Sequence, residues 1–492
     1  MKQIPQIQTL GELKSSGYQP RTLKEEMRDN LIQAIKEGRK VFKGIWGFDE
    51  TVIPDLERAI LSKHHVLLLG LRGQAKTRLA RLLTELLDEW VPYIQGTELQ
   101  DDPMAPISTQ AHDLLRQHGD HTPIGWLHRD QRYVEKLATP DVSIADLIGD
   151  IDPIKAANEK LAFSDERVIH FGLIPRAHRS IFVINELPDL QPRIQVALFN
   201  ILQEGDIQIR GFKTRLELDI HFVFTANPED YTNRGSIITP LKDRIDAQIL
   251  THYPEDPEIS KRITLQESRI SAAASAMVKV PVLVHDILEQ VAFEARESEY
   301  VDPKSGVSAR LTISAYESLV STVERRLLLN GETTGSARIN DFWGVVPSIT
   351  GKVELVYEGE QEGPYQVALH FMHKAIRQQF LVHFPNPEKL NRGRDKDPYG
   401  TILAWFSAGN DLALLGSDTE ASFAEKLRSV AGLEDFVRQQ GIDRSSELAY
   451  MELVLHGLAE FQQIGKDLVG NQLTFKDDLA DALQDLEDED EE

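Results

Sequence analysis

The chain contains no cysteine among its 492 residues. Disulfides and thiolate metal sites are therefore excluded, and the absence fits a reducing compartment. The sequence also has no run of eighteen or more apolar residues, which is roughly the length that a transmembrane helix needs. The first thirty residues lack the apolar core of a secretory signal. We therefore expect a cytoplasmic protein.

Basic residues are scarce relative to acidic ones. The chain has 54 Lys and Arg against 78 Asp and Glu, which gives a formal net charge of −24. This balance argues against broad binding to nucleic acid or to anionic membranes, because phosphate contacts need a cationic face. Part of the excess lies at the C-terminus, where Glu487 to Glu492 are all acidic. We interpret this run as a solvated, disordered tail; the less favoured alternative is a docking segment for a basic partner.

The order of predicted elements indicates an α/β fold with a parallel sheet flanked by helices. Apolar strands are predicted at 65–70, 180–187 and 218–228, with helices at 77–90 and 192–205 between them. The chain is too long for a single core. We divide it into an N-terminal helical segment (1–44), an α/β nucleotide-binding domain (45–255), a helical lid (256–350), a helical C-terminal region (351–484) and an acidic tail (485–492).

The stretch GLRGQAKT, residues 70–77, resembles a phosphate-binding loop in which Ala75 replaces the second glycine. It follows an apolar strand and opens a helix, which is the context that directs backbone N–H groups at phosphates. Lys76 would contact the terminal phosphates, and the Thr77 hydroxyl would ligate Mg²⁺. If residue 75 requires a positive φ, its Cβ costs about 1–2 kcal/mol. The loop residues predicted to contact ATP are Gly70, Gly73, Gln74, Ala75, Lys76 and Thr77.

Polar residues end the next two predicted strands. Asn185 and Glu186 close the strand SIFVINEL, and Asn227 closes HFVFTANP. The carboxyl ends of parallel strands line the ligand crevice of such sheets. We predict that Glu186 polarises the attacking water, that Asn227 orients it and that Asn185 lies at the Mg²⁺ site, where it supplies no formal charge. Ordinary strand ends are the alternative interpretation of each residue taken alone.

Two arginines downstream are candidates for contacts with the γ-phosphate. Arg244, in PLKDRIDAQI, could reach the nucleotide of a neighbouring subunit and stabilise charge on the transferring phosphoryl group. Arg310 opens a predicted helix and could contact the nucleotide of its own subunit. Either arginine alone would be read as a surface ion pair, but both follow the loop and strand residues in the expected order.

Taken together, these motifs resemble the AAA+ ATPases of the magnesium-chelatase I-subunit and MoxR-type family. The resemblance covers residues 40–350 and includes GIWGFDE, ATPDVSIADLIGDIDPIKA, FGLIPRAHRSIFVINELPDL and NILQEGDIQIRGFKTRLELDIHFVFTANPED. It implies ATP and Mg²⁺ as ligands, with Trp46 and Gly47 in the turn beside the adenine, Arg244 as arginine finger and Arg310 as sensor 2. It further implies a ring, usually a hexamer, and a partner protein with a von Willebrand A domain.

The leading functional hypothesis is an ATP-hydrolysing motor that drives remodelling or metal insertion through a partner. Its two forms, a metal-chelatase I subunit and a MoxR-type chaperone unrelated to tetrapyrroles, remain open. A nucleotide-dependent scaffold with little hydrolysis is the alternative that Ala75 and Asn185 favour. A DNA-acting AAA+ protein is a third class, against which the acidity argues. The histidines of 111–128 are interpreted as part of a polar insertion rather than a metal site.

Overall fold

The computed structural model describes residues 4–160, 166–209, 215–228, 235–390, 397–469 and 472–477. The chain forms two compact units, residues 1–253 and 254–492. The acidic tail predicted at 485–492 lies outside the described residues. Within the described ranges, none of the helices combines the length and the apolar character needed to cross a membrane.

A five-stranded sheet forms the centre of the first unit, with the order β11-β1-β10-β7-β4. All neighbouring strands are parallel, as predicted. The three strands expected from the sequence are present, and two edge strands were not predicted. The edge strands are short and mix polar with apolar residues, so they lack the continuous apolar run of the buried strands. The bounds are β1 (Val66–Leu69), β4 (Tyr133–Leu137), β7 (Ser180–Asn185), β10 (Ile220–Ala226) and β11 (Ala247–Leu250).

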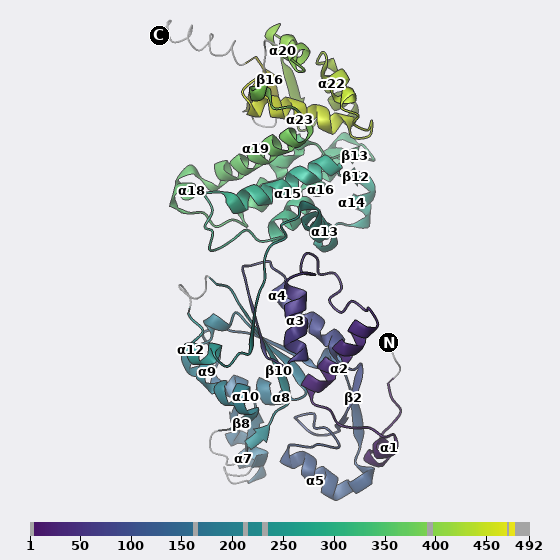
Figure 1. The fold of residues 1–492 in the computed structure, drawn as a ribbon, viewed down its shortest axis with the longest axis vertical. Coiled ribbons are helices and arrows are strands. Elements are labelled where there is room, and N and C mark those ends of the chain that lie inside the picture. The colour runs from purple at the N-terminus through teal and green to yellow at the C-terminus, as the bar shows by residue number, and fades with distance from the viewer. Residues whose placement is uncertain are drawn as a thin grey trace. The chain divides into compact units, whose positions relative to one another are not determined.

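Helices cover both faces of this sheet (Figure 1). Residues of β1 alternate between two apolar clusters: Val66 and Leu68 pack with helices α2, α3 and α4, and Leu67 and Leu69 pack with helices α8, α9, α10 and α12. The N-terminal residues therefore belong to the same core as the sheet. The bounds are α1 (Leu10–Ser15), α2 (Leu23–Lys36), α3 (Val52–Leu61), α4 (Lys76–Leu82), α8 (Leu173–Arg176), α9 (Pro192–Ala197), α10 (Phe199–Glu204) and α12 (Thr239–Lys242).

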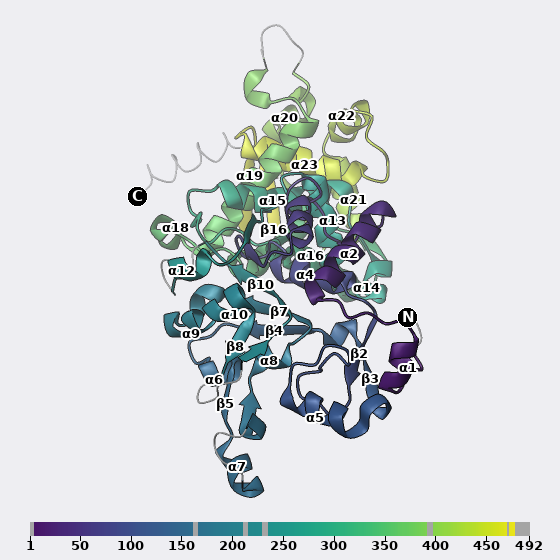
Figure 2. The ribbon, with the colours of Figure 1, turned by 60° about the horizontal axis from the view of Figure 1, so that its bottom comes forward.

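The helix predicted at 77–90 is shorter than expected. It begins at Lys76, ends at Leu82 and continues as a 3₁₀ turn, Leu83–Leu86. Trp90 then starts a strand that pairs with β3, and this long-range pairing outweighs the local helical pattern. Among the described residues, the segments between the sheet strands form three antiparallel strand pairs, β2–β3, β5–β6 and β8–β9, and further helices (Figure 2). Their bounds are β2 (Trp90–Ile94), α5 (Thr109–His118), β3 (Ile124–His128), α6 (Ile144–Leu147), β5 (Gly149–Ile151), α7 (Pro153–Glu159), β6 (Ile169–Phe171), β8 (Asp206–Gln208) and β9 (Arg215–Glu217).

The second unit is mostly helical, as predicted, and its helices share one apolar cluster. It also contains a three-stranded antiparallel sheet, β14-β16-β15, which the sequence analysis did not predict. Leu473 and Phe475 of β16 are fully buried and pack in the cluster that includes helix α23. The bounds are α13 (Pro257–Glu267), α14 (Ala272–Met277), β12 (Val278–Lys279), α15 (Val282–Glu297), α16 (Arg310–Asn330), β13 (Gly335–Ser336), α17 (Val346–Thr350), α18 (Tyr357–Glu362), α19 (Pro364–His383), α20 (Gly400–Ser407), β14 (Leu412–Leu415), α21 (Glu420–Ser429), α22 (Leu433–Gln439), α23 (Glu447–Glu460), β15 (Gly465–Val469) and β16 (Gln472–Lys476).

Candidate functional site

The loop between β1 and α4 is held against two neighbouring strands at its first residue. The Gly70 amide donates to the carbonyl of Ala226 at 3.2 Å. A Cβ at Gly70 would meet Thr251 Oγ1 at 2.0 Å and Gln74 Oε1 at 2.2 Å. Those two atoms are themselves hydrogen-bonded, with Thr251 Oγ1 donating to Gln74 Oε1 at 2.8 Å. Only glycine fits at position 70. The predicted loop residue Gln74 is buried here, where its side chain is hydrogen-bonded to Thr251.

Ala75 adopts the left-handed conformation, with φ 56° and ψ 16°. The strain of about 1–2 kcal/mol that a Cβ costs at positive φ therefore applies to Ala75. Gly73, two residues earlier, also has positive φ, 75°, but carries no such strain. The loop thus has two left-handed residues, Gly73 and Ala75, directly before α4.

Replacing Ala75 by glycine is expected to raise the free energy of unfolding by up to about 1.5 kcal/mol. Glycine removes about 1–2 kcal/mol of strain at the left-handed position, which stabilises the folded state. The greater conformational freedom of glycine in the unfolded chain offsets about 0.5–1 kcal/mol of this gain. Ala80→Gly, in the interior of the same helix, is the control and should lower stability by about 1 kcal/mol. Urea unfolding of both variants measures the two signs; loss of stability in Ala75→Gly would contradict the left-handed assignment.

Lys76 is almost fully buried, with 8% of its surface exposed. Its ammonium donates to the carbonyl of Leu71 at 2.9 Å, to Asn227 Oδ1 at 2.7 Å and to the carbonyl of Gly70. A buried charge is stable only when such partners surround it. The loop carbonyls and Asn227 therefore hold the ammonium at the carboxyl end of β1, where the terminal phosphates of a nucleotide would meet it.

Glu186 joins the same group of side chains. Asn227 Nδ2 donates to Glu186 Oε2 at 2.9 Å, so the Asn227 amide links the carboxylate of Glu186 to the ammonium of Lys76. Glu186 itself is left-handed, with φ 54° and ψ 51°, and its amide donates to Thr225 Oγ1 at 3.3 Å. From this turn the carboxylate reaches Asn227, which follows β10. Three residues predicted from separate motifs are thus in one hydrogen-bonded chain.

Asn185 is the last residue of β7, and its place at a Mg²⁺ site remains a prediction. Its Oδ1 accepts from Thr225 Oγ1 at 3.0 Å, and its Nδ2 donates to Glu135 Oε1 at 2.5 Å. Both ends of the amide are therefore engaged by protein groups. Thr225 and Glu135 were not predicted from the sequence as part of this site. A hydroxyl within the otherwise apolar strand HFVFTA was a signal for Thr225, whereas Glu135 lies in a strand that was not predicted.

The predicted Mg²⁺ ligands suit a hard cation, which prefers oxygen donors. Thr77 is exposed at the first turn of α4, and the carboxylate of Glu186 and the side chain of Asn185 lie at the end of β7. Among the described residues there is no cluster of three or more His, Cys, Asp and Glu that could hold a metal by itself.

The turn containing Trp46 and Gly47 is anchored to the segment that follows β11. Gly47 has a φ of 80°, and Phe48 packs edge-on against His252 with ring centroids 5.0 Å apart. Thr51 Oγ1 lies 2.8 Å from His252 Nε2. This places the turn beside the strand that neighbours β1, and its role at an adenine remains a prediction.

The two predicted arginines occupy different units. Arg244 lies just after α12, where its guanidinium stacks over Phe199 at 4.6 Å from the ring centroid. Its Nη1 donates to the carbonyl of Pro240 at 2.7 Å, and its Nε donates to Gln203 Oε1 at 3.2 Å. Arg310 is exposed at the first residue of α16, in the second unit. The roles of both arginines stay predictions.

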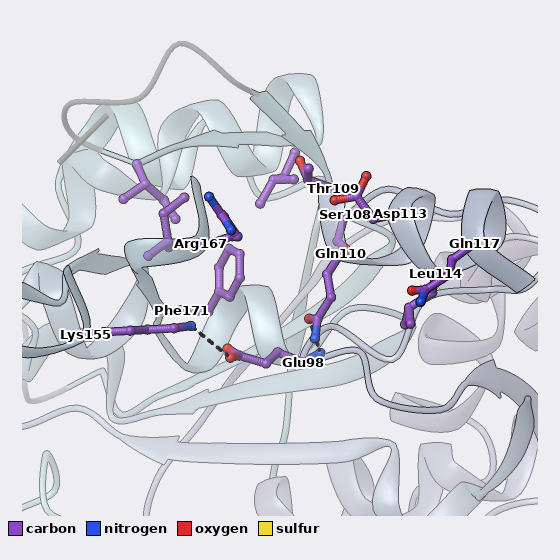
Figure 3. A pocket seen from close by; sticks show the side chains of 13 residues that line it. Glu98, Ser108, Thr109, Gln110, Asp113, Leu114, Gln117, Lys155, Arg167 and Phe171 are labelled. Carbon is purple, nitrogen blue, oxygen red and sulfur yellow. Dashed lines mark hydrogen bonds and ion pairs between the residues drawn. The ribbon is translucent and has the colours of Figure 1, made fainter. Parts of the chain in front are cut away.

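A cavity of about 330 Å³ lies elsewhere in the first unit, between α5, α7 and the hairpin strands β6 and β9 (Figure 3). Its floor includes Phe171, and at its edge Lys155 Nζ lies 4.0 Å from Glu98 Oε1. None of the loop residues 70–77 lines it. The nucleotide constellation is therefore separate from this cavity, which belongs to the insertions between the sheet strands.

The family described as Sigma-54 interaction domain matches residues 157–248. Similar solved structures include a protein of Cytophaga hutchinsonii described as an ATPase, with 17% identity over 74% of this chain and 98% of that chain (TM-score 0.30). NtrX of Brucella abortus in complex with ADP has 12% identity over 71% and 66% (TM-score 0.37). A complex of the magnesium-chelatase subunits BchI and BchD has 19% identity over 62% and 95% (TM-score 0.32).

These similarities are low in both identity and TM-score, and the fold class follows from the structure itself. The parallel five-stranded sheet flanked by helices, with its loop after the first strand, confirms the predicted fold class. The first unit is therefore α/β, and the second unit, which follows it in the chain, is mostly helical.

Proposed function

We propose that the chain binds ATP with Mg²⁺ and hydrolyses it as an AAA+ motor. One observation carries the proposal: the hydrogen-bonded chain from the Lys76 ammonium through the Asn227 amide to the Glu186 carboxylate. A phosphate-binding lysine, a water-orienting amide and a carboxylate base are the parts that phosphoryl transfer to water needs. A site that had lost its chemistry would have no reason to keep these three groups in contact.

Each residue has a distinct task in the proposed reaction. Lys76 binds the terminal phosphates through its ammonium, and Asn227 orients the attacking water. The Glu186 carboxylate accepts a proton from that water while the water oxygen bonds to the γ-phosphorus. The bond from this phosphorus to the bridging oxygen then breaks, which releases ADP and phosphate. Bound Mg²⁺ would supply charge neutralisation at the phosphates, held beside Thr77 and Asn185.

We further propose that the protein works as a ring, in which Arg244 of each subunit serves the nucleotide of its neighbour. The resemblance to magnesium-chelatase I subunits and MoxR-type proteins supports a hexamer and a partner with a von Willebrand A domain. Metal insertion, if this chain drives it, would take place on other subunits. Remodelling of a protein unrelated to tetrapyrroles is the other form of the same motor.

Two alternatives have specific support. A scaffold that binds ATP without turnover is favoured by Asn185, which brings no charge to the metal. An ATPase that acts on a sigma factor is favoured by the match of residues 157–248 to the sigma-54 interaction domain. Nucleotide-dependent binding of purified sigma-54, measured by fluorescence anisotropy, tests the second alternative; no binding with ATP, ADP or a transition-state analogue would remove it.

The binding step is tested by Lys76→Ala. The wild-type chain is expected to bind ATP and release phosphate in the presence of Mg²⁺. The variant should bind MgATP roughly 10- to 100-fold more weakly, because it lacks a charge-assisted hydrogen bond that contributes about 1.5–3 kcal/mol. Isothermal calorimetry measures the affinity. Lys14→Ala, which removes an exposed lysine paired with Asp120, is the control. Equal affinities of Lys76→Ala and the wild type would refute the nucleotide site.

A further inference from the structure

Glu135 is an acidic residue that is hydrogen-bonded to Asn185, at the edge of the predicted nucleotide site. It lies on β4, which pairs with β7 so that Leu137 is opposite Asn185 and Glu135 is opposite Val183. Figure 2 shows the two strands side by side. Because side chains alternate along a strand, residues 135 and 137 share a face with 183 and 185. Val183 belongs to the apolar cluster of α4, so Glu135 is on the sheet face that the helix after the P-loop covers.

The carboxylate of Glu135 is divided between two sets of partners. Oε1 accepts from Asn185 Nδ2. Oε2 accepts from Arg81 Nη2 at 3.1 Å and from the Tyr133 hydroxyl at 3.2 Å. The side chain is 27% exposed, whereas that of Arg81 is 68% exposed. Burial, with the nearby charge of Glu135, raises the pKa of Tyr133 to about 12, so the phenol stays a donor to this carboxylate.

Asn185 connects Glu135 to the catalytic residues. Asn185 Oδ1 accepts a hydrogen bond from the Thr225 hydroxyl. The hydroxyl oxygen of Thr225 in turn accepts one from the Glu186 amide. The Asn185 amide is thereby oriented with its NH₂ group towards Glu135. The position at the end of β7 that could hold a carboxylate is occupied by the neutral amide of Asn185. The carboxylate of Glu135 is hydrogen-bonded to that amide.

Helix α4, which carries the expected Mg²⁺ ligand Thr77, also contacts Glu135. Thr77 and Arg81 are four residues apart, so they lie on one side of the helix, about 6 Å apart along its axis. Arg81 pairs with Glu135 at 3.1 Å, so the Glu135 carboxylate contacts both the helix that carries Thr77 and the Asn185 amide. Carboxylates in this outer position commonly orient and strengthen the inner ligands of a metal.

We propose that Glu135 supplies the negative charge on the Mg²⁺ side of the nucleotide site that Asn185 does not. The inference rests on the proposed function. Glu135 is a positioning residue here: it acts through Asn185 and through the electrostatic potential at the site. The exposed Arg81 also pairs with the Glu135 carboxylate. In this proposal Arg81 competes with the Mg²⁺ side of the site for that negative charge.

Glu135→Gln tests this inference because it keeps an oxygen acceptor for Asn185 and removes the charge. A fluorescent ATP analogue is titrated with the full chain in EDTA and then at increasing Mg²⁺. Binding in EDTA should be unchanged, and the Mg²⁺ concentration at half-maximal enhancement should rise about 10- to 100-fold. The double variant Glu135→Gln with Asn185→Asp, which returns one carboxylate to the site, should recover most of this loss.

Arg81→Gln separates the proposal from a purely structural ion pair. If the pair with Arg81 were the purpose of Glu135, the two single variants would shift Mg²⁺ dependence alike, and that result would overturn the inference. We expect Arg81→Gln to leave the dependence unchanged or to shift it to lower Mg²⁺, because it removes a competing cation. Glu85→Gln, which breaks a comparable pair with Arg129, is the matched control and should behave as wild type.

The failure of this inference can be told apart from failure of the proposed function. If the wild-type chain binds the analogue and Glu135→Gln has unaltered Mg²⁺ dependence, the role of Glu135 is refuted while the nucleotide site stands. If the wild-type chain binds no analogue in either condition, the proposed function is refuted and the inference falls with it.

Discussion

Glu186→Gln is expected to lower the rate of ATP hydrolysis about 10²- to 10⁴-fold, which is the usual contribution of a general base. Glutamine keeps the oxygen that accepts from Asn227 Nδ2, so the link to Lys76 survives the change. Because only the proton acceptor is lost, the affinity for MgATP should remain close to that of the wild type. Phosphate release and calorimetric ATP binding, measured on the same preparations, give the two quantities.

The two proposed modes of action predict different results for this variant. A motor requires a measurable wild-type rate that Glu186→Gln suppresses. A scaffold predicts background phosphate release in both proteins together with tight ATP binding, and this outcome would overturn the motor. Glu217→Gln, at an exposed position on β9, is the control for a general effect of losing one carboxylate and should hydrolyse ATP at the wild-type rate.

The contacts among Lys76, Glu186 and Asn227 could be predicted because topology alone brings them together. Each follows an apolar strand, and parallel strands place their carboxyl ends along one edge of the sheet. Order along the chain and strand ends were sufficient to name these residues. The side-chain hydrogen bonds that join them add detail to an arrangement already implied by the pattern.

Glu135 and Thr225 could not be assigned in this way. Glu135 belongs to an edge strand, where one polar face is solvated and the apolar signal is weak. Its bond to Asn185 joins residues 50 positions apart, and no local pattern predicts such a pairing. The same holds for the left-handed backbone at Ala75, which follows from the shape of the whole loop, and for the sheet of β14 to β16, whose apolar residues are buried by helices distant in the sequence.

Arg244→Ala is expected to reduce ATP hydrolysis by about 10³-fold, the lower end of the contribution of an arginine finger. ATP binding should change little, because the guanidinium would stabilise charge that develops only in the transition state. In the structure Arg244 is held by Phe199, Gln203 and Pro240 of its own chain. These contacts keep the charged group at the surface of the first unit, where a neighbouring subunit could use it. A normal rate in Arg244→Ala would remove this role.

Mixing the two inactive variants tests whether Arg244 acts across subunits. A ring that contains both Glu186→Gln and Arg244→Ala chains has interfaces in which an intact Glu186 meets an intact Arg244 from its neighbour. With random assembly about a quarter of the interfaces are of this kind, so hydrolysis should recover to roughly a quarter of the wild-type rate. If Arg244 served the nucleotide of its own chain, every site in the mixture would lack one group and no activity would return. Recovery on mixing would therefore establish both the shared site and the ring, and a mixture as inactive as its components would exclude the shared site.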